Sequence, residues 1–290
     1  MRTPDERFSS LPGFPWLPGY LDIDGLRLAR IEEGVGHPVV LVHGLPTWSF
    51  LYRKVIPPLL DAGLRVIAPD LVGFGHSEKP KRDWYSYDAV VASFGAHLDA
   101  IGLGEPITLV VHDWGGPIGL RWAVEHSDSV ARLVVLDTGL YAMGSGSTPA
   151  RRSFSEWVAS TDSLPVGGLL QGGTSTELPD EVVAAYEAPF PDAESQAGVL
   201  AHALMVPLDD DAPAAPAMAA TLERMSSWQQ PTLVVWGEHD PILGPRIGER
   251  LSQRIPGTVA FETVDASHFL QEDVGEHLGA RIEEFIATDT

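Results

Sequence analysis

The chain has 290 residues, 44% of them hydrophobic, enough to bury a large core in one domain with an insertion or in two smaller domains. Its formal net charge of −21 disfavours binding to nucleic acid or to a membrane, because so acidic a protein gains nothing from releasing the counterions of either surface. Cysteine is absent, which excludes disulfides, thiolate metal sites and a cysteine nucleophile.

The N-terminal segment MRTPDERFSSLPGFPW contains charges and prolines but not the apolar core of an export signal. Later apolar runs such as VVLV and ITLVV are too short to span a bilayer. We therefore expect a cytoplasmic protein that is a monomer or a small homo-oligomer and acts on a small neutral partner.

The first half of the chain alternates short β-branched runs with amphipathic segments. The predicted strands are residues 39–43, 65–69, 107–112 and 132–137, and the predicted helices between them are residues 50–62, 87–103 and 115–126. Continuous apolar strands separated by helices indicate βαβ units and a parallel sheet covered on both faces.

Residues 140–215 do not continue this alternation of strands and helices. They are rich in Gly, Pro, Ser and Ala, and they contain helical patterns but no strand; these patterns lie at residues 153–160, 180–188 and 194–204. We predict a helical cap (lid) domain here, over the sheet edge where open α/β sheets bind ligands, with residues 209–220 as its return linker. Residues 1–139 and 216–290 would form the main domain, which also receives predicted strands at 232–237 and 259–264 and a last helix at 274–287.

Three polar residues each follow a predicted strand. Asp113 lies in VVHDWGGPIG, Asp240 in WGEHDPILGP and His268 in VDASHFLQED. The chain order of nucleophile, acid and histidine is that of the α/β-hydrolase fold, in which a strand, a sharp turn and a helix expose the nucleophile. The residue at the apex of that turn is a carboxylate rather than a serine.

At this point the sequence resembles the haloalkane dehalogenases. The resemblance runs in order through nearly the whole chain, in the segments HGLPTWSFLYRKVIPPL, APDLVGFGHSEKP, VVHDWGG, AAYEAPFPDAESQAG, WGEHDPILGP and SHFLQED. It implies the α/β-hydrolase fold, with a mostly parallel eight-stranded sheet flanked by helices and a helical cap inserted between strands six and seven. The matching subfamily has its catalytic acid after strand seven.

The resemblance implies a chemistry that suits these residue types. Asp113 would displace halide from a saturated carbon and form an alkyl ester, which water can reopen, whereas serine would leave an ether. His268 would deprotonate that water, oriented by Asp240. The products from a small, neutral, apolar halogenated substrate would be a primary alcohol, a halide ion and a proton, with water as co-substrate and no cofactor or metal.

By the same resemblance, the backbone N–H groups of Leu45 and Trp114 would form the oxyanion hole. The indole N–H of Trp114 would bind the departing halide, with Trp157 of the cap as a second donor or, alternatively, an aromatic of the cap core. Leu45 departs from the family pattern, since relatives carry Glu or Asn there. The backbone role is unaffected by this change, but a side-chain contact to the halide is lost.

Asp137 is a second candidate acid. It ends the strand at 132–137, where other subfamilies of these dehalogenases place their catalytic acid. The WGEHDPILGP segment favours Asp240, and an ordinary polar strand end is the alternative for Asp137. If both carboxylates approach His268, repulsion between them should raise the pKa of one.

Two other functions are compatible with the motifs. An epoxide hydrolase would use the same triad but needs two cap tyrosines as acids, and the cap offers Tyr141 and Tyr186. The second possible function is that of a non-catalytic hydrolase-fold protein that binds a small apolar ligand. His43 and His112 could suggest a metal site, but both lie beside motif residues and fit structural roles better.

Overall fold

The structure is a computed structural model that describes residues 1–141 and 148–288; residues 142–147 of the predicted cap lie outside the described residues. Eight strands form one sheet in the order β1-β2-β4-β3-β5-β6-β7-β8. Their bounds are β1 Gly19–Ile23, β2 Leu26–Glu33, β3 Pro38–Val42, β4 Arg65–Pro69, β5 Ile107–His112, β6 Val130–Leu136, β7 Thr232–Gly237 and β8 Thr258–Val264. The predicted fold class is confirmed, and every strand predicted from a β-branched run is present.

The sheet is parallel from β4 through β8, and β2 pairs antiparallel with both β1 and β4. Asp24 and Gly25 connect β1 to β2, with φ values of 49° and 79°. An Asp-Gly pair with positive φ at both residues is the two-residue hairpin turn. The sequence therefore contains a signal for this hairpin. The hairpin was not predicted because β1 and β2 are only partly buried and do not form continuous apolar runs.

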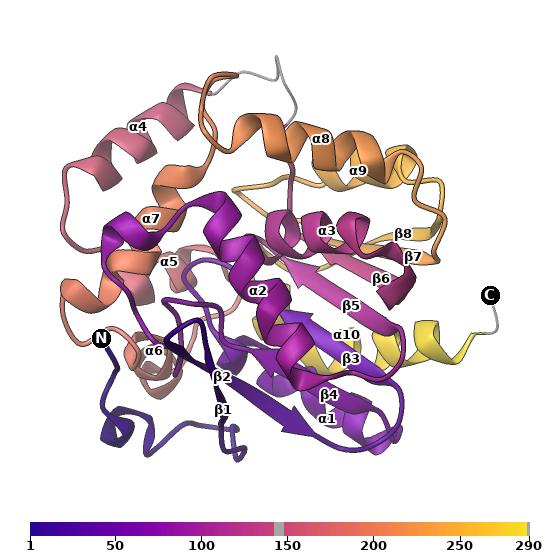
Figure 1. The fold of residues 1–290 in the computed structure, drawn as a ribbon, viewed down its shortest axis with the longest axis horizontal. Helices are drawn as coiled ribbons and strands as arrows, with labels where there is room; N and C mark the ends of the chain where they lie inside the picture. The colour runs from indigo at the N-terminus through magenta and orange to yellow at the C-terminus, as the bar shows by residue number, and fades with distance from the viewer. Residues whose placement is uncertain (142–147, 289–290) are drawn as a thin grey trace.

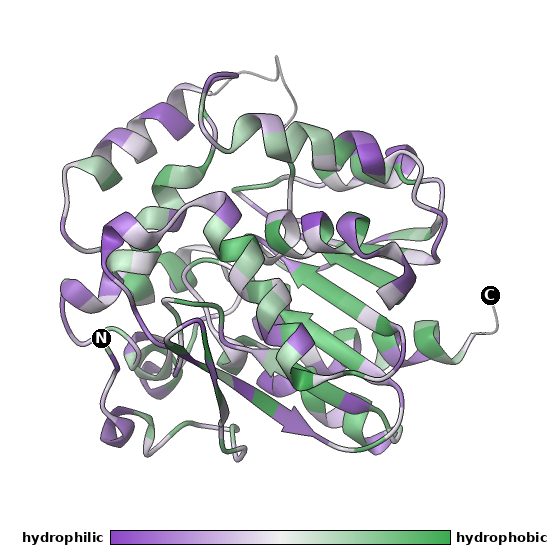
Figure 2. Cartoon of the chain, in the orientation of Figure 1, coloured by the Kyte–Doolittle hydropathy of each residue, from purple (hydrophilic) through white to green (hydrophobic). Residues whose placement is uncertain are grey.

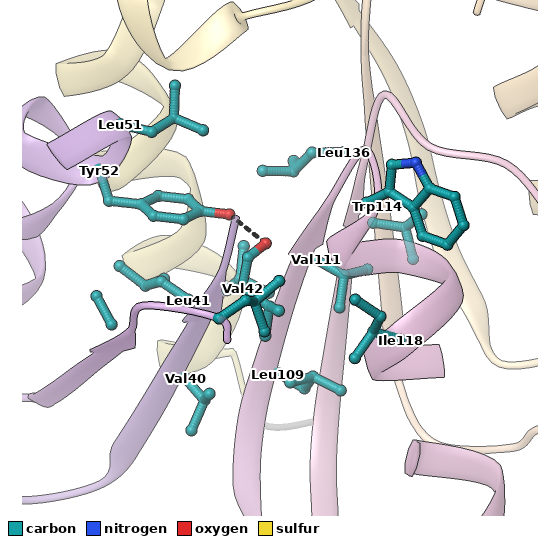
Figure 3. Close-up of a cluster of buried hydrophobic side chains, with 14 of the residues drawn as sticks. Val40, Leu41, Val42, Leu51, Tyr52, Leu109, Val111, Trp114, Ile118 and Leu136 are labelled. Carbon is teal, nitrogen blue, oxygen red and sulfur yellow. Dashed lines mark hydrogen bonds between the residues drawn. The ribbon is translucent and has the colours of Figure 1, made fainter. Parts of the chain in front are cut away.

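Buried strands form the centre of the molecule. Every residue of β3, β5 and β7 is buried, as expected of parallel strands covered on both faces. Figure 2 shows β3 and β5 as continuous hydrophobic ribbons, whereas the helices around them alternate between hydrophobic and hydrophilic residues. Figure 3 shows side chains of these strands packed around Val42, whose carbonyl accepts a 2.9 Å hydrogen bond from the hydroxyl of Tyr52.

Helices surround this sheet. The helices of the main part are α1 Ile56–Asp61, α2 Tyr87–Ile101, α3 Gly115–Glu125, α8 Ala215–Met225, α9 Arg246–Arg254 and α10 Leu270–Ala287. Short 3-10 helices are η1 Asp5–Phe8, η2 Ser49–Lys54, η3 Arg82–Trp84 and η4 Ser127–Ser129. α1 packs against α10, whereas α3 packs against both α2 and α8.

The prediction of a linker at residues 209–220 is wrong for its second half, where α8 begins. Alanine and methionine are strong helix formers, and Pro216 lies in the first turn, where its missing N–H costs nothing. The helix predicted at 50–62 is instead η2 followed by α1, because Pro57 and Pro58 fit only the first turn of a helix.

Between β6 and β7 the chain also forms α4 Pro149–Ala159, α5 Val166–Gly172, α6 Asp180–Glu187, η5 Glu194–Gln196 and α7 Ala197–Met205. α4 packs against α7, and α5 packs against α6. Figure 1 shows these helices gathered at the end of the sheet toward which the arrows of β3 and β5 point. Side chains that follow the parallel strands therefore lie on the same side as these helices.

Candidate active site

Asp113 stands at the turn between β5 and α3, with a φ of 47°. A non-glycine residue in this left-handed region is strained, and such strain is frequent at functional positions. The Thr138 hydroxyl donates a 2.6 Å hydrogen bond to the backbone carbonyl of Asp113, which stabilises this turn. The side chain of Asp113 is 17% exposed, so this carboxylate is sheltered but accessible to a small molecule.

Backbone N–H groups donate to the carboxyl group of Asp113. The N–H of Leu45 donates to Oδ1 at 2.6 Å, and the N–H of Trp114 also donates to this carboxyl group. Gly44 permits the approach, because a Cβ there would lie 2.3 Å from Oδ1. The two N–H groups predicted to form an oxyanion hole thus converge on Asp113.

The other carboxylate oxygen faces His268. Asp113 Oδ2 lies 3.5 Å from Nε2 of His268, and Nδ1 of the same ring lies 2.8 Å from Oδ2 of Asp240. Oδ1 of Asp240 accepts hydrogen bonds from the N–H groups of Ile242 and Leu243, at 2.6 and 2.9 Å. The loop after β7 therefore fixes the carboxylate that orients the imidazole.

The three side chains shift one another's pKa values. Burial disfavours the charged form of each, but the mutual hydrogen bonds and opposite charges outweigh it. The pKa values of Asp113 and Asp240 are lowered, and the pKa of His268 is raised to about 10. His268 is therefore an imidazolium between two carboxylates at neutral pH.

Asp137, the alternative acid, is also buried in this region but has different partners. Both of its carboxylate oxygens accept hydrogen bonds from the N–H of Gly237, at 3.0 and 3.2 Å. Burial, followed by the negative charge of Asp240, raises its pKa well above the usual value. Asp240, and not Asp137, makes the hydrogen bond to His268, while burial and the charge of Asp240 disfavour the charged form of Asp137.

The two predicted halide donors have different surroundings. Trp114 is 5% exposed, and Figure 3 shows its indole nitrogen pointing away from the packed strand side chains. Trp157 lies on α4, is 42% exposed and contacts the ring of Phe154 at 5.7 Å. Within the described part of the chain, no hydrogen bond or ring contact joins Trp157 to Trp114, Asp113 or His268.

Two other histidines support the backbone of the site. His112 Nε2 donates to the carbonyl of His268 at 2.8 Å. His43 is bonded at both nitrogens, to the carbonyl of Gly44 and to the N–H of Leu71. These contacts agree with the structural roles predicted for His43 and His112. Among residues 1–141 and 148–288, no group of side chains is arranged to hold a metal ion. In the same residues no helix has the length and apolarity required to cross a membrane.

One buried polar residue near Asp113 was not predicted from the sequence. His202 lies on α7 with no exposed surface, and its ring contacts Trp114 at 5.3 Å. The available signal was a single histidine in the apolar helical segment VLAHALM.

The sheet, the sharp turn at Asp113 and the order of the three polar residues define an α/β-hydrolase, and residues 37–273 match the alpha/beta hydrolase fold family. The chain is 43% identical to a haloalkane dehalogenase of Mycobacterium marinum over 97% of this chain and 98% of that protein. It is 40% identical to one of Psychrobacter cryohalolentis, over 99% and 97% of the two chains. The tetrameric haloalkane dehalogenase of Paraglaciecola agarilytica superposes with a TM-score of 0.90 at 33% identity, covering 100% and 99% of the chains.

The chain belongs to the haloalkane dehalogenase family, which confirms the family resemblance seen in the sequence. It is accordingly a hydrolase that acts on carbon–halide bonds.

Proposed function

We propose that this protein hydrolyses small, neutral, apolar haloalkanes to a primary alcohol, a halide ion and a proton, through an ester on Asp113. The observation that carries the proposal is that the two oxygens of this carboxylate have different partners. Oδ1 is held by the N–H of Leu45, whereas Oδ2 faces His268 at 3.5 Å. Oδ2 is therefore the attacking atom.

In the first step, Oδ2 forms a bond to the substrate carbon while the carbon–halogen bond breaks, and the halide leaves with the bonding electrons. No base is needed, because the lowered pKa of Asp113 keeps it ionised. The indole N–H of Trp114 is a donor without an acceptor, which suits an anion in an apolar setting. Trp157 is proposed as a second halide donor, for which its indole has to leave the exposed position on α4.

Ester formation changes the basicity of His268. The Asp113 carboxylate and its hydrogen bond raise the pKa of the imidazole, and the ester is neutral. The pKa of His268 therefore falls, the imidazolium loses its proton to solvent, and the neutral ring becomes a base. This proton is the one that the overall reaction releases.

In the second step, His268 takes a proton from water as the water oxygen bonds to the ester carbonyl carbon. Negative charge develops on Oδ1, which the N–H groups of Leu45 and Trp114 stabilise; losing one such donor typically costs about 10²–10³ in rate. The tetrahedral carbon then breaks its bond to Oδ2, which leaves with the alkyl group as the alcohol oxygen and takes the proton from His268. The carboxylic acid that remains on residue 113 returns its proton to His268, which restores the starting carboxylate and imidazolium. Asp240 stabilises the imidazolium throughout this step.

The contacts of the cap tyrosines do not favour an epoxide hydrolase. The hydroxyl of Tyr141 donates to Asp210 at 2.6 Å, and that of Tyr186 donates to the buried carboxylate of Glu272. Two such hydroxyls would have to protonate an epoxide oxygen beside Asp113. A ligand-binding protein without activity is disfavoured as well, because it has no need of a charged Asp113–His268–Asp240 array.

We also propose that residues 140–215 act as the cap that covers Asp113, with residues 1–139 and 216–290 as the main domain. Support comes from α7, which brings His202 against Trp114. The relative from P. agarilytica is a tetramer, and a monomer or small homo-oligomer stays our prediction for this chain.

Halide release from a panel of chloro-, bromo- and iodoalkanes, with styrene oxide alongside, tests this function. We expect wild-type protein to release halide and Asp113→Asn to release none above a buffer control. His268→Gln should still form the ester but not reopen it, so mass spectrometry should detect a gain of one alkyl group on Asp113. Diol formation from the epoxide without halide release, or a folded wild type that is inactive on the whole panel, would overturn the proposal.

A further inference from the structure

His202 is a fully buried histidine on α7, the helix whose other buried residues are Gly198, Val199, Leu200, Ala201 and Ala203. Its Nδ1 lies 2.8 Å from the carbonyl oxygen of Gly198, one turn earlier in the same helix. A carbonyl can only accept, so Nδ1 carries the hydrogen of this bond. The geometry thereby fixes the tautomer of the neutral ring.

In this tautomer Nε2 presents a lone pair. Nε2 is buried and has no hydrogen-bond partner among the described residues. Burial lowers the pKa of His202 to about 4, so the ring is neutral near neutral pH and Nε2 is an acceptor. Buried acceptors are normally satisfied, and one left without a partner is destabilising, which calls for a donor at this place.

The ring of His202 extends from α7 toward the sheet. Nε2 is on the side of the imidazole away from its Cβ, and the ring makes edge-on contacts with Phe74 at 4.9 Å and with Trp114 at 5.3 Å. The negative charge of Asp113 is near enough to influence the pKa of His202. Tyr85, whose ring centroid is 5.9 Å away, has a buried hydroxyl that also lacks a partner among the described residues.

Other buried histidines lack this combination. His43 uses both nitrogens. His112 also has an unpartnered nitrogen, Nδ1, but its ring contacts His268 and Phe269 rather than Trp114. His97 on α2 also has an unpartnered Nε2, but the charges that influence its pKa are those of Arg30, Asp70 and Glu32 rather than Asp113. Only His202, within the described ranges, combines a free acceptor with a ring contact to Trp114.

We propose that Nε2 of His202 is the acceptor of a polar subsite beside Trp114, and that this subsite binds the hydroxyl group of hydroxyl-bearing haloalkanes. The inference rests on the proposed dehalogenation at Asp113 and names a substrate class for it. A lone pair repels the halide, so the acceptor serves the other end of the substrate. A neutral hydroxyl donor satisfies Nε2 without introducing a charge into apolar surroundings.

The test compares ω-bromoalcohols with bromoalkanes in which a methyl group replaces the hydroxyl, such as 4-bromobutan-1-ol and 1-bromopentane. The readout is the ratio of the two kcat/KM values for each variant, rather than the rate on either substrate. His202→Phe keeps an aromatic ring in the cluster but removes the acceptor. One hydrogen bond is worth about 1–1.5 kcal/mol, so we expect the ratio to fall about five- to tenfold.

Two further variants separate the subsite from general effects on folding. His202→Gln supplies a carbonyl acceptor without the ring and should recover part of the ratio. His97→Phe removes a buried histidine with a similarly unpartnered nitrogen at another place and should leave the ratio unchanged. Thermal unfolding of each variant confirms that folded protein is compared.

An equal ratio in wild type and His202→Phe, over the series of chain lengths, would overturn the subsite, as expected if bound water alone satisfies Nε2. A change of the same size in His97→Phe would overturn it too. Failure of the proposed function looks different, because wild type would then release halide from neither substrate of any pair.

Discussion

Asp113, Asp137 and Asp240 follow three neighbouring strands, β5, β6 and β7, yet their pKa values shift in opposite directions. Asp113 and Asp240 face the imidazolium of His268, which favours their charged forms. Burial and the charge of Asp240 disfavour the charged form of Asp137, and the hydrogen bond from the Gly237 N–H does not offset them. The residue type was predicted from the sequence at each position, but the charge state depends on partners from distant segments.

Substitution by asparagine should affect the reaction differently at the two candidate acids. Asp240→Asn removes the anion that orients His268 and stabilises its charge, and we expect ester hydrolysis to slow by about 10²–10⁴-fold, as in other triads. Asp137→Asn should release halide at nearly the wild-type rate. Single-turnover kinetics with a bromoalkane separates ester formation from its hydrolysis and measures both variants.

Asp137 also predicts a pH dependence of stability. Its pKa is raised in the folded state, so the folded protein binds the proton more tightly than the unfolded chain. This contribution favours folding at low pH and is lost as the pH rises above the unfolded value of about 3.9. Asp137→Asn should therefore raise the unfolding temperature more at pH 8 than at pH 5. Equal changes at the two pH values, or slow ester hydrolysis in Asp137→Asn, would contradict this assignment.

At the scale of elements, α4 determines what Trp157 can do. The helix carries both Trp157 and Phe154 at exposed positions, 42% and 38%, respectively. Trp114 instead begins α3 directly behind Asp113 and is almost completely buried. The two tryptophans therefore differ strongly in solvent exposure, a difference that their sequence contexts did not indicate.

We therefore expect the two tryptophans to contribute unequally to halide binding. Trp114→Phe removes a hydrogen bond to an anion, worth about 1.5–3 kcal/mol, and should weaken bromide product inhibition by about 10- to 100-fold. Trp157→Phe should weaken it less, because its indole has first to move inward. Trp16→Phe, in the N-terminal segment, is the control and should have no effect. A loss with Trp157→Phe as large as that with Trp114→Phe would contradict the expectation.

The elements that the sequence missed have a common property. The β1–β2 hairpin is half-buried, and α8 and α9 lie at the surface, so their apolar patterns are interrupted. The buried strands β3 and β5 were predicted almost to the residue, because continuous apolar runs have few other interpretations. The apolar signal is strongest where both faces of an element are covered.

At the scale of the whole molecule, a buried ion pair ties α6 to η2 and α10. Arg53 of η2 forms a bidentate pair with Glu272 of α10, and the hydroxyl of Tyr186 on α6 donates to the same carboxylate. All three residues are at most 6% exposed. Glu272 is four residues after His268, so the same contacts hold the start of α10 beside the site.

Breaking this network should cost more than its hydrogen bonds alone. Glu272→Gln leaves the Arg53 cation buried without its anion, and we expect a loss of about 3–5 kcal/mol in the free energy of unfolding. Tyr186→Phe removes one hydrogen bond and should cost about 1 kcal/mol. Urea denaturation measures both. Glu223→Gln, which breaks the exposed pair with Arg254, should change stability by less than about 1 kcal/mol, and a similar loss in Glu272→Gln and Glu223→Gln would contradict the role of burial.

The sequence by itself determined the family, the sheet of parallel strands and the identity and order of Asp113, Asp240 and His268, because motif residues and apolar runs are local properties of the chain. The tertiary structure decided which carboxylate contacts His268, that Trp157 is exposed on α4, and that His202 adjoins Trp114. Each of these depends on distances between segments far apart in the chain. Such distances follow from the packing of α4–α7 and the strand ends, which no local pattern encodes.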